Sequence, residues 1–429
     1  MRTAIASAWA LLLGMALIML GNGLQGTLLG VRATLEGFST TVTGFVMTGY
    51  FAGFLVGSVL APKIVQRVGH IRVFAALASL ASTSALVHAV FVDPWSWGGM
   101  RLVTGFSYAG LYVVAESWLN DRATNETRGQ ILSIYMVVTY GGMTVGQLLL
   151  NAGDPGGFSL FVLISVLVSL ALVPISLTAV AAPSFDTPAS VSLRQLYRIS
   201  PLGVVGGLGA GAVYGIIFGM GAVYARGVGM SVAQVSLFMG LILFAGMLFQ
   251  WPVGKLSDIF DRRKIILGAS GLSAVLCLLA GLTPGISIPA LVGVAFGLGS
   301  LALPMYSLCG AHLNDHLQPN QMVAASGGFV LISGLGASFG PLTASAAMSA
   351  VGPAGFFLAI ALLFGGIMLF AVWRMTRRAP VPQEEQGSFV VMPPRASPIA
   401  AALNPEAPED SADWEEISDY AEDSGDSES

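Results

Sequence analysis

Arg101 and Glu116 are ionisable residues that stand inside one long apolar stretch of the sequence. A charge in such a stretch is costly unless it faces a partner or a water-filled cavity. Arg101 either faces a cavity, where it offers a fixed positive charge to an anionic group, or reaches outward to water. Three roles stay open for Glu116: gating, proton carriage and a plain interfacial charge. We predict gating. A helix rise of about 1.5 Å per residue sets Glu116 roughly 22 Å from Arg101, which is too far for the two to pair. The nearest partners predicted for Glu116 are therefore Arg67 and Arg72.

The stretch Gly254–Lys264 combines a glycine with paired charges at the end of another apolar run. Asp258 and Arg262 are four residues apart, so their side chains can meet on one face of a helix. A charge-assisted hydrogen bond between them, partly out of water, can act as a latch that stabilises one of two conformations. Gly254 is expected to let two helices approach closely. The alternative is that Arg262 and its basic neighbours only set the orientation of the chain.

The elements that carry these residues are predicted to be membrane helices. The chain has 429 residues, of which 55% are hydrophobic and only 10% charged, which excludes an ordinary soluble enzyme. A bilayer core of about 30 Å is crossed by roughly 20 mostly apolar helical residues. Twelve such stretches are predicted, at residues 5–30, 40–62, 71–92, 95–119, 129–152, 157–181, 201–225, 231–254, 264–283, 286–310, 321–349 and 352–375.

Basic residues are distributed unevenly over the connections between these stretches. If the N-terminus is cytoplasmic, the loops on its side hold 15 Lys and Arg, and the opposite loops hold two, Arg32 and Arg226. Cytoplasmic loops carry an excess of bases, so we predict a multi-pass protein of the plasma (inner) membrane with both ends cytoplasmic. The first stretch is longer than the apolar core of a cleavable signal peptide, and we expect it to be retained.

The two halves of the chain repeat each other at an offset of about 194 residues. The repeated elements, each with its counterpart, are Leu119-Asn120-Asp121 with Leu313-Asn314-Asp315, and Gly142-x-x-x-Gly146 with Gly336-x-x-x-Gly340. We therefore predict a duplicated six-helix unit, with an N-terminal half at residues 1–182 and a C-terminal half at residues 201–378. Residues 183–200 are predicted to form a cytoplasmic linker.

The C-terminal region differs sharply from the rest. Residues 379–429 hold one basic residue, Arg395, and thirteen acidic residues. This composition is typical of a disordered segment, and we predict a disordered acidic cytoplasmic tail. Trp414 and Tyr420 among the acids leave two alternatives, namely docking on a basic protein partner or on the inner loops of the protein itself.

Several of these motifs resemble those of the major facilitator superfamily. The stretch Gly254-Lys255-Leu256-Ser257-Asp258-Ile259-Phe260-Asp261-Arg262-Arg263-Lys264 resembles its signature loop, and residues 62–72 resemble the first-half counterpart. That counterpart has Pro62 and Gln66 where the family has Gly and Asp. Arg101 with Gly105 resembles the Arg-x-x-x-Gly of the fourth helix. Within the superfamily, Arg67-Val-Gly-His-x-Arg72 and Glu116-Ser-Trp-Leu-Asn120 resemble the YcaD-type branch.

The resemblance implies an all-α membrane protein of twelve transmembrane helices in two six-helix halves. It also implies that the first, fourth, seventh and tenth helices line a central cavity. The candidate substrate contacts on these helices are Asn22, Gln25, Arg101, Tyr108, Tyr112, Tyr214 and Tyr306. For each tyrosine the alternative is a packing role with a local acceptor for its hydroxyl. The acid at Glu116 resembles a member of the charge relay that some family members build around the first-half loop.

The function expected from these features is secondary active transport of a small solute by alternating access, with protons as one option for coupling. The sequence contains no nucleotide-binding loop and neither of the metal motifs HExxH and CxxC. We therefore expect no enzymatic activity, no cofactor, no metal and no nucleic-acid partner. The other function considered is a membrane sensor that keeps a carrier fold without transport and signals through its acidic tail.

Overall fold

The computed structural model describes residues 2–124, 126–177, 191–318, 321–392, 395 and 397–404, and within these ranges the chain forms helices and no strands. The helices of the first half are α1 (Arg2–Leu35), α2 (Thr40–Val68), α3 (His70–Val90), α4 (Pro94–Arg122), α5 (Arg128–Leu148) with η1 (Leu149–Ala152), α6 (Ser159–Leu170) and α7 (Leu172–Ser176). Those of the second half are α9 (Pro201–Gly227), α10 (Val232–Ile259), α11 (Arg262–Leu282), α12 (Ile288–Ala302), α13 (Pro304–Asn314), α14 (Met322–Val351) and α15 (Gly355–Met375). The short α8 (Leu193–Ile199) precedes the second half, and η3 (Gln383–Glu385) and η4 (Pro398–Leu403) follow it.

The ends of the helices follow from local sequence signals. Ser39 accepts a hydrogen bond from the backbone of Val42 and so caps α2, and Asp93 caps α4 immediately before Pro94. Such caps satisfy backbone donors that the first turn of a helix leaves free. Short capped connections return the chain at once into the next helix, which gives an up-and-down bundle.

Eleven stretches of the described chain are long and apolar enough to cross a membrane. Twelve were expected, and the described helices do form twelve crossings when α6 joins α7 and α12 joins α13. The crossing that is not among the eleven is α4, which carries both Arg101 and Glu116. The all-α membrane fold predicted from the sequence is confirmed.

Matching glycines make matching contacts in the two halves. A methyl group on Gly146 of α5 would overlap the carbonyl oxygen of Leu20 in α1. A methyl group on Gly340 of α14 would likewise overlap the carbonyl oxygen of Ala212 in α9. Small residues let membrane helices pack backbone to backbone. The glycine repeat therefore holds the fifth helix of each half against the first helix of the same half.

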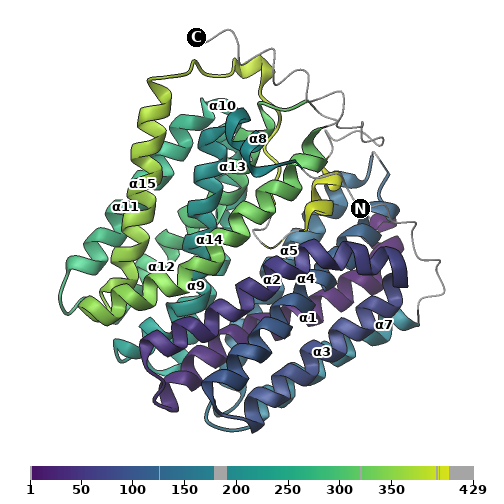
Figure 1. Ribbon diagram of the computed structural model, residues 1–429, viewed down its shortest axis with the longest axis vertical. Helices are drawn as coiled ribbons and strands as arrows, with labels where there is room; N and C mark the ends of the chain where they lie inside the picture. Colours follow the sequence, from purple (N-terminus) through teal and green to yellow (C-terminus); the bar gives the residue numbers. More distant parts are fainter. Residues whose placement is uncertain are drawn as a thin grey trace.

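The two halves are joined at the end of the bundle where α1 finishes and α2 begins, which we call the far end. Thr41 and Ser349 form a hydrogen bond of 3.0 Å between their hydroxyls, and Asn151 donates to the hydroxyl of Ser236 at 2.9 Å. At the opposite end, which we call the termini end, η4 packs against both α4 and α14. Figure 1 shows this yellow segment between the purple first half and the green second half.

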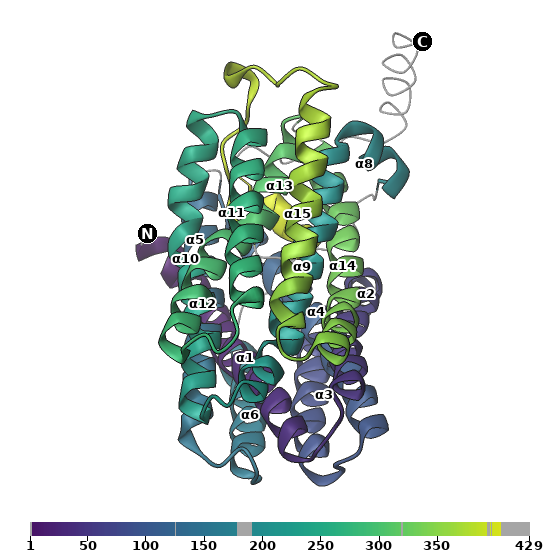
Figure 2. The same ribbon diagram turned by 90° about the vertical axis from the view of Figure 1, so that its left-hand side faces the viewer.

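The connection between the halves is only partly described. The expected boundary at residues 182 and 183 falls in the stretch 178–190, which lies outside the described residues. The short helix α8 lies at the same end of the bundle as the C-terminal segment (Figure 2). The limits of the two halves and of the linker stay predictions.

Candidate functional site

Aromatic rings from both halves meet in the interior of the bundle. The centroid of the Tyr50 ring on α2 lies 6.2 Å from that of Tyr108 on α4. Across the boundary between the halves, the ring of Phe51 on α2 lies 6.5 Å from that of Tyr214 on α9. All of these side chains are buried. Two of the predicted pathway tyrosines thus lie close to the junction of the halves.

Arg101 points into this interior rather than outward to water. Its side chain is 3% exposed, and its guanidinium carbon lies 4.4 Å from the centroid of the Tyr50 ring. Asn22 on α1 donates from its side-chain amide to the hydroxyl of Tyr50 at 3.4 Å. The buried position disagrees with an outward reach to water, and the role of Arg101 as a cavity contact stays a prediction.

Several of the predicted pathway residues carry buried polar atoms that find no hydrogen-bond partner in the described part of the chain. These atoms are the amide nitrogen of Gln25, Nε of Arg101 and the hydroxyls of Tyr108 and Tyr306. Leaving a buried donor unpaired costs about 1–3 kcal/mol, so such groups are rare unless they serve a ligand or ordered water. Tyr112, by contrast, donates to the sulfur of Met19 at 3.1 Å.

Glu116 is fully buried near the termini end of α4. One carboxylate oxygen accepts from the hydroxyl of Tyr135 at 2.7 Å, and the other accepts from the backbone nitrogen of Ser397 at 2.7 Å. Arg67 and Arg72 are exposed. The structure thus gives Glu116 two neutral partners in place of the two bases that we expected, because α4 turns this carboxylate inward while both arginines lie on the surface.

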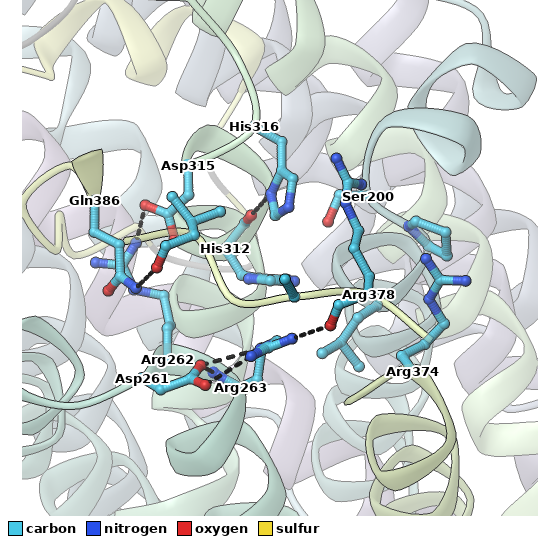
Figure 3. A pocket seen from close by; sticks show the side chains of 14 residues that line it. Ser200, Asp261, Arg262, Arg263, His312, Asp315, His316, Arg374, Arg378 and Gln386 are labelled. Carbon is cyan, nitrogen blue, oxygen red and sulfur yellow. Dashed lines mark hydrogen bonds and ion pairs between the residues drawn. The ribbon is translucent and has the colours of Figure 1, made fainter. Parts of the chain in front are cut away.

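Arg262 is the centre of a charged cluster at the termini end. Its guanidinium donates to Asp258 at 3.2 Å, to Asp315 at the end of α13, and to the carbonyl oxygen of Gly387 at 2.8 Å. The predicted pair of Asp258 and Arg262 is therefore in contact, and Asp315 is a further acid that the prediction did not include. Asp315 is labelled beside Arg262 in Figure 3.

Gly254 has a different neighbour from the one that the sequence suggested. A methyl group at this position would overlap the ring of Phe389, which belongs to the C-terminal segment. The backbone nitrogen of Phe389 also donates to Asp258 at 2.9 Å. Gly254 therefore makes room for the C-terminal segment, whereas we expected it to make room for a second helix.

A second charged pair lies beside this cluster, in a small cavity that opens to the surface (Figure 3). Arg263 donates to Asp261 at 2.8 Å and to the carbonyl oxygen of Arg378 at 2.8 Å. Burial acts to raise the pKa of Asp261, but the hydrogen bonds and positive charge of Arg263 outweigh it, so this pKa lies below its ordinary value. Burial lowers the pKa of His316 in the same cavity, which keeps its ring neutral near pH 7. The cavity is therefore positively charged through its arginines.

The C-terminal segment runs from this cluster into the space between the halves. We call residues 379–392, 395 and 397–404 the docked segment. The backbone of Met392 exchanges two hydrogen bonds with the hydroxyl of Ser307 on α13, at 2.9 and 3.1 Å. Further in, Ser397 reaches Glu116 on α4, and Leu403 is fully buried. This placement differs from the disordered tail that we expected from Ala379 onward.

The physical reason lies in an uneven distribution of charge within the tail. Only two of its thirteen acids, Glu384 and Glu385, precede residue 405. The stretch from Ser388 to Leu403 is mainly apolar and can be buried. The acidic remainder, with Trp414 and Tyr420, lies outside the described residues.

Comparison with known proteins agrees with this architecture. The family model described as Major Facilitator Superfamily matches residues 11–248 and 202–404. The chain belongs to the major facilitator superfamily. It is 28% identical over 340 residues to the protein described as "Uncharacterized MFS-type transporter YcaD" of Salmonella heidelberg (strain SL476), covering 79% of this chain and 88% of the relative. The corresponding protein of Escherichia coli O6:K15:H31 is 28% identical over 333 residues, covering 77% and 86%. The resemblance to the YcaD-type branch is confirmed.

Solved structures of other members share the fold. The nucleoside transporter NupG superposes with a TM-score of 0.73 at 14% identity, covering 88% of this chain and 100% of that one. A bacterial homolog of the human lysosomal transporter Spinster superposes with a TM-score of 0.69 at 15% identity, covering 88% and 98%. These proteins establish the twelve-helix superfamily fold for this chain, which is an integral multi-pass membrane protein of a family of secondary transporters.

Three residues of the site were not predicted from the sequence, namely Asp315, Tyr50 and Arg395, whose guanidinium carbon lies 5.1 Å from the centroid of the Tyr50 ring. Asp315 had a signal, since it ends the second copy of the repeated Leu-Asn-Asp motif. Tyr50 had none beyond being an aromatic residue in an apolar stretch. Arg395 is the single base of an acidic tail, a contrast that singles it out without indicating where it lies.

Proposed function

We propose that this superfamily member moves a small solute across the inner membrane by alternating access, with both chain ends in the cytoplasm. The observation that carries the proposal is the set of buried, unpaired polar atoms on Gln25, Arg101, Tyr108 and Tyr306, which come from both halves. Groups of this kind are stable only where a polar ligand or water completes them. A non-transporting sensor would have no need of them.

The position of the contacts between the halves supports a rocking movement. The halves are joined at the far end by the hydrogen bond between Thr41 and Ser349, and at the termini end the docked segment lies between them. If the termini end is cytoplasmic, this is the arrangement of a carrier that is closed to the outside. The opposite state requires the contact between α2 and α14 to separate.

Within this proposal the candidate residues have distinct roles. Asn22, Gln25, Arg101 and the four tyrosines contact the solute, and the cluster around Arg262 stabilises the closed arrangement at the termini end. Coupling to protons is included in the proposal, with Glu116 as the buried acid next to the pathway. Arg67 and Arg72 are proposed to set the orientation of the chain in the membrane, because both side chains are exposed.

A disulfide across the far end tests the movement without knowledge of the substrate. Cysteines at Thr41 and Ser349 are oxidised in a chain whose buried Cys277 and Cys309 are replaced by alanine. The readout is the labelling of Gln25→Cys by a membrane-impermeant maleimide applied from outside. We expect slow labelling in the reduced protein and almost none in the oxidised one.

The matched control places the disulfide within one half. Ser82 on α3 and Ser165 on α6 have their hydroxyl oxygens 2.7 Å apart, so cysteines there can also be joined. This bond should leave the labelling of Gln25→Cys unchanged. Equal labelling with and without the Thr41–Ser349 disulfide would contradict alternating access.

A further inference from the structure

Arg395 of the docked segment occupies the interior between the two halves. Its guanidinium carbon lies 5.1 Å from the centroid of the Tyr50 ring, 5.1 Å from that of Tyr214 and 5.6 Å from that of Phe218. We call these three rings the aromatic cage. Tyr50 belongs to α2 of the first half, and Tyr214 and Phe218 belong to α9 of the second half. A cation held here therefore contacts both halves at once.

The guanidinium lies against ring faces, and its one side-chain hydrogen bond among the described residues is with the hydroxyl of Tyr112. Arg395 is 7% exposed, yet its Nε and Nη1 atoms have no hydrogen-bond partner among the described residues. A cation over the face of an aromatic ring is attracted by the ring quadrupole, and more strongly where water is excluded. Recognition by three such faces favours a positive charge with delocalised or alkylated character.

Charged side chains lie both at the cage and along the docked segment. Arg101 lies over the same Tyr50 ring, so a fixed positive charge stands beside the cage and opposes the cation that the rings hold. Glu116, fully buried, accepts a hydrogen bond from Ser397, which stands two residues after Arg395. Glu116 therefore holds the docked segment next to the cage through the backbone of Ser397.

The docked segment is tied to the bundle at points that a rocking carrier has to separate. Ser397 and η4 contact α4 of the first half, while Met392 and Phe389 contact the second half. A small hollow remains between the segment, α13 and α14, lined by Tyr306 and Phe329 among others. The segment therefore occupies part of the proposed pathway and leaves a small space beside it.

We propose that the aromatic cage is the cation-binding subsite of the transport pathway, and that Arg395 occupies it in place of a solute that carries a guanidinium or an alkylated ammonium group. This proposal rests on the transport function proposed above and names the substrate class of the same site. Because one cage cannot hold both groups, the docked segment competes with the solute, and the solute binds only to the fraction of molecules in which Arg395 has left.

Direct binding to the purified full-length protein tests the proposal. The probe is benzylguanidine, and its neutral isostere benzylurea is the matched ligand control; both are titrated by isothermal calorimetry. Arg395→Ala opens the cage without changing a membrane helix, and we expect benzylguanidine to bind at least about tenfold more tightly to it than to wild type. Benzylurea should bind weakly to both proteins. Arg395→Lys keeps a cation in the cage and should behave like wild type.

Variants of the cage itself complete the test. In the Arg395→Ala chain, Tyr214→Leu removes one ring and should abolish most of the gain, whereas Tyr214→Phe keeps the ring and should retain it. Equal affinity of benzylguanidine for wild type and Arg395→Ala would overturn the proposal, and so would equal binding of benzylurea and benzylguanidine. Binding is measured without transport, so this outcome is distinct from failure of the far-end disulfide experiment.

Discussion

Arg262 and Asp315 form a buried ion pair, with side chains that are 1% and 2% exposed. The pair joins the start of α11 to the residue that follows α13, 53 positions along the chain. Asp258, the acid of the signature loop itself, is bonded to the same guanidinium but is 41% exposed. The structural anchor of this loop is therefore Asp315, while Asp258 contacts both Arg262 and the docked segment.

Asp315→Asn should destabilise the protein strongly, because it leaves the charge of Arg262 buried without its main partner. Breaking such a pair costs about 3–5 kcal/mol. Asp258→Asn should cost at most about 1 kcal/mol, since exposed pairs contribute little. Its expected effect is on the balance between the two open states and on transport. Unfolding free energies in detergent check the comparison, and a larger loss for Asp258→Asn would contradict it.

The helices and their duplication could be predicted because both leave local marks in the sequence. Long apolar runs indicate membrane crossings, and Gly146 and Gly340 stand at repeated positions because the same close helix contact is made twice. Arg101 and Tyr214 could be placed in the interior for a similar reason, since a resemblance to a known fold assigns whole helices to a cavity. Apolar runs and glycine repeats can be recognised from a few residues that are close together in the sequence.

The contacts of the docked segment could not be predicted, because they join residues that are far apart in the chain. Ser397 and Glu116 are 281 positions apart, and Phe389 and Asp258 are 131 apart. Composition taken over residues 379–429 combines an apolar part with an acidic part and indicates disorder for both. The prediction of Arg67 as a partner of Glu116 was wrong for the same reason, since only the fold shows that Arg67 points to the surface.

Both chain ends are expected in the cytoplasm. Reporter tags at either end should therefore be accessible only from inside, and a cysteine at Arg226 should react with an impermeant maleimide from outside. The reason is the excess of basic residues in the loops at the termini end. A cysteine at Lys63, on the opposite side, is the matched control and should react only after permeabilisation. An externally accessible C-terminus would contradict the proposed orientation.

Gly254→Ala should displace the docked segment, because the added methyl group overlaps the ring of Phe389. The reporter is the maleimide reactivity of Ala400→Cys, a position that is fully buried in the docked segment. We expect the reactivity to rise about tenfold. Gly268→Ala is the matched control, since a methyl group there meets nothing within 4 Å, and it should leave the reactivity unchanged.

The direct nature of this overlap can be checked by removing the ring. In a Phe389→Ala chain, adding Gly254→Ala should have little further effect on the reactivity of Ala400→Cys, because the two side chains no longer meet. Contacting residues are non-additive in this way, whereas independent ones add. Additive effects of the two changes would mean that Gly254 acts on the segment by some other route.

Glu116→Gln should also release the docked segment. The carboxylate accepts from the backbone of Ser397 and from the hydroxyl of Tyr135, and an amide has only one oxygen to serve both donors. Losing a hydrogen bond to a charged group costs about 1.5–3 kcal/mol, which corresponds to a rise of about tenfold or more in the reactivity of Ala400→Cys. Tyr135→Phe keeps the carboxylate and should have a smaller effect.

Variants of the loop arginines separate this role of Glu116 from gating through an ion pair. Arg67→Ala and Arg72→Ala should leave the reactivity of Ala400→Cys at the wild-type level, because both side chains are exposed and Glu116 is bonded to neutral groups. If either substitution reproduced the effect of Glu116→Gln, the charge relay expected from the family resemblance would operate in this chain after all. If Glu116→Gln itself left Ala400→Cys protected, the bond to Ser397 would not be what holds the segment between the halves.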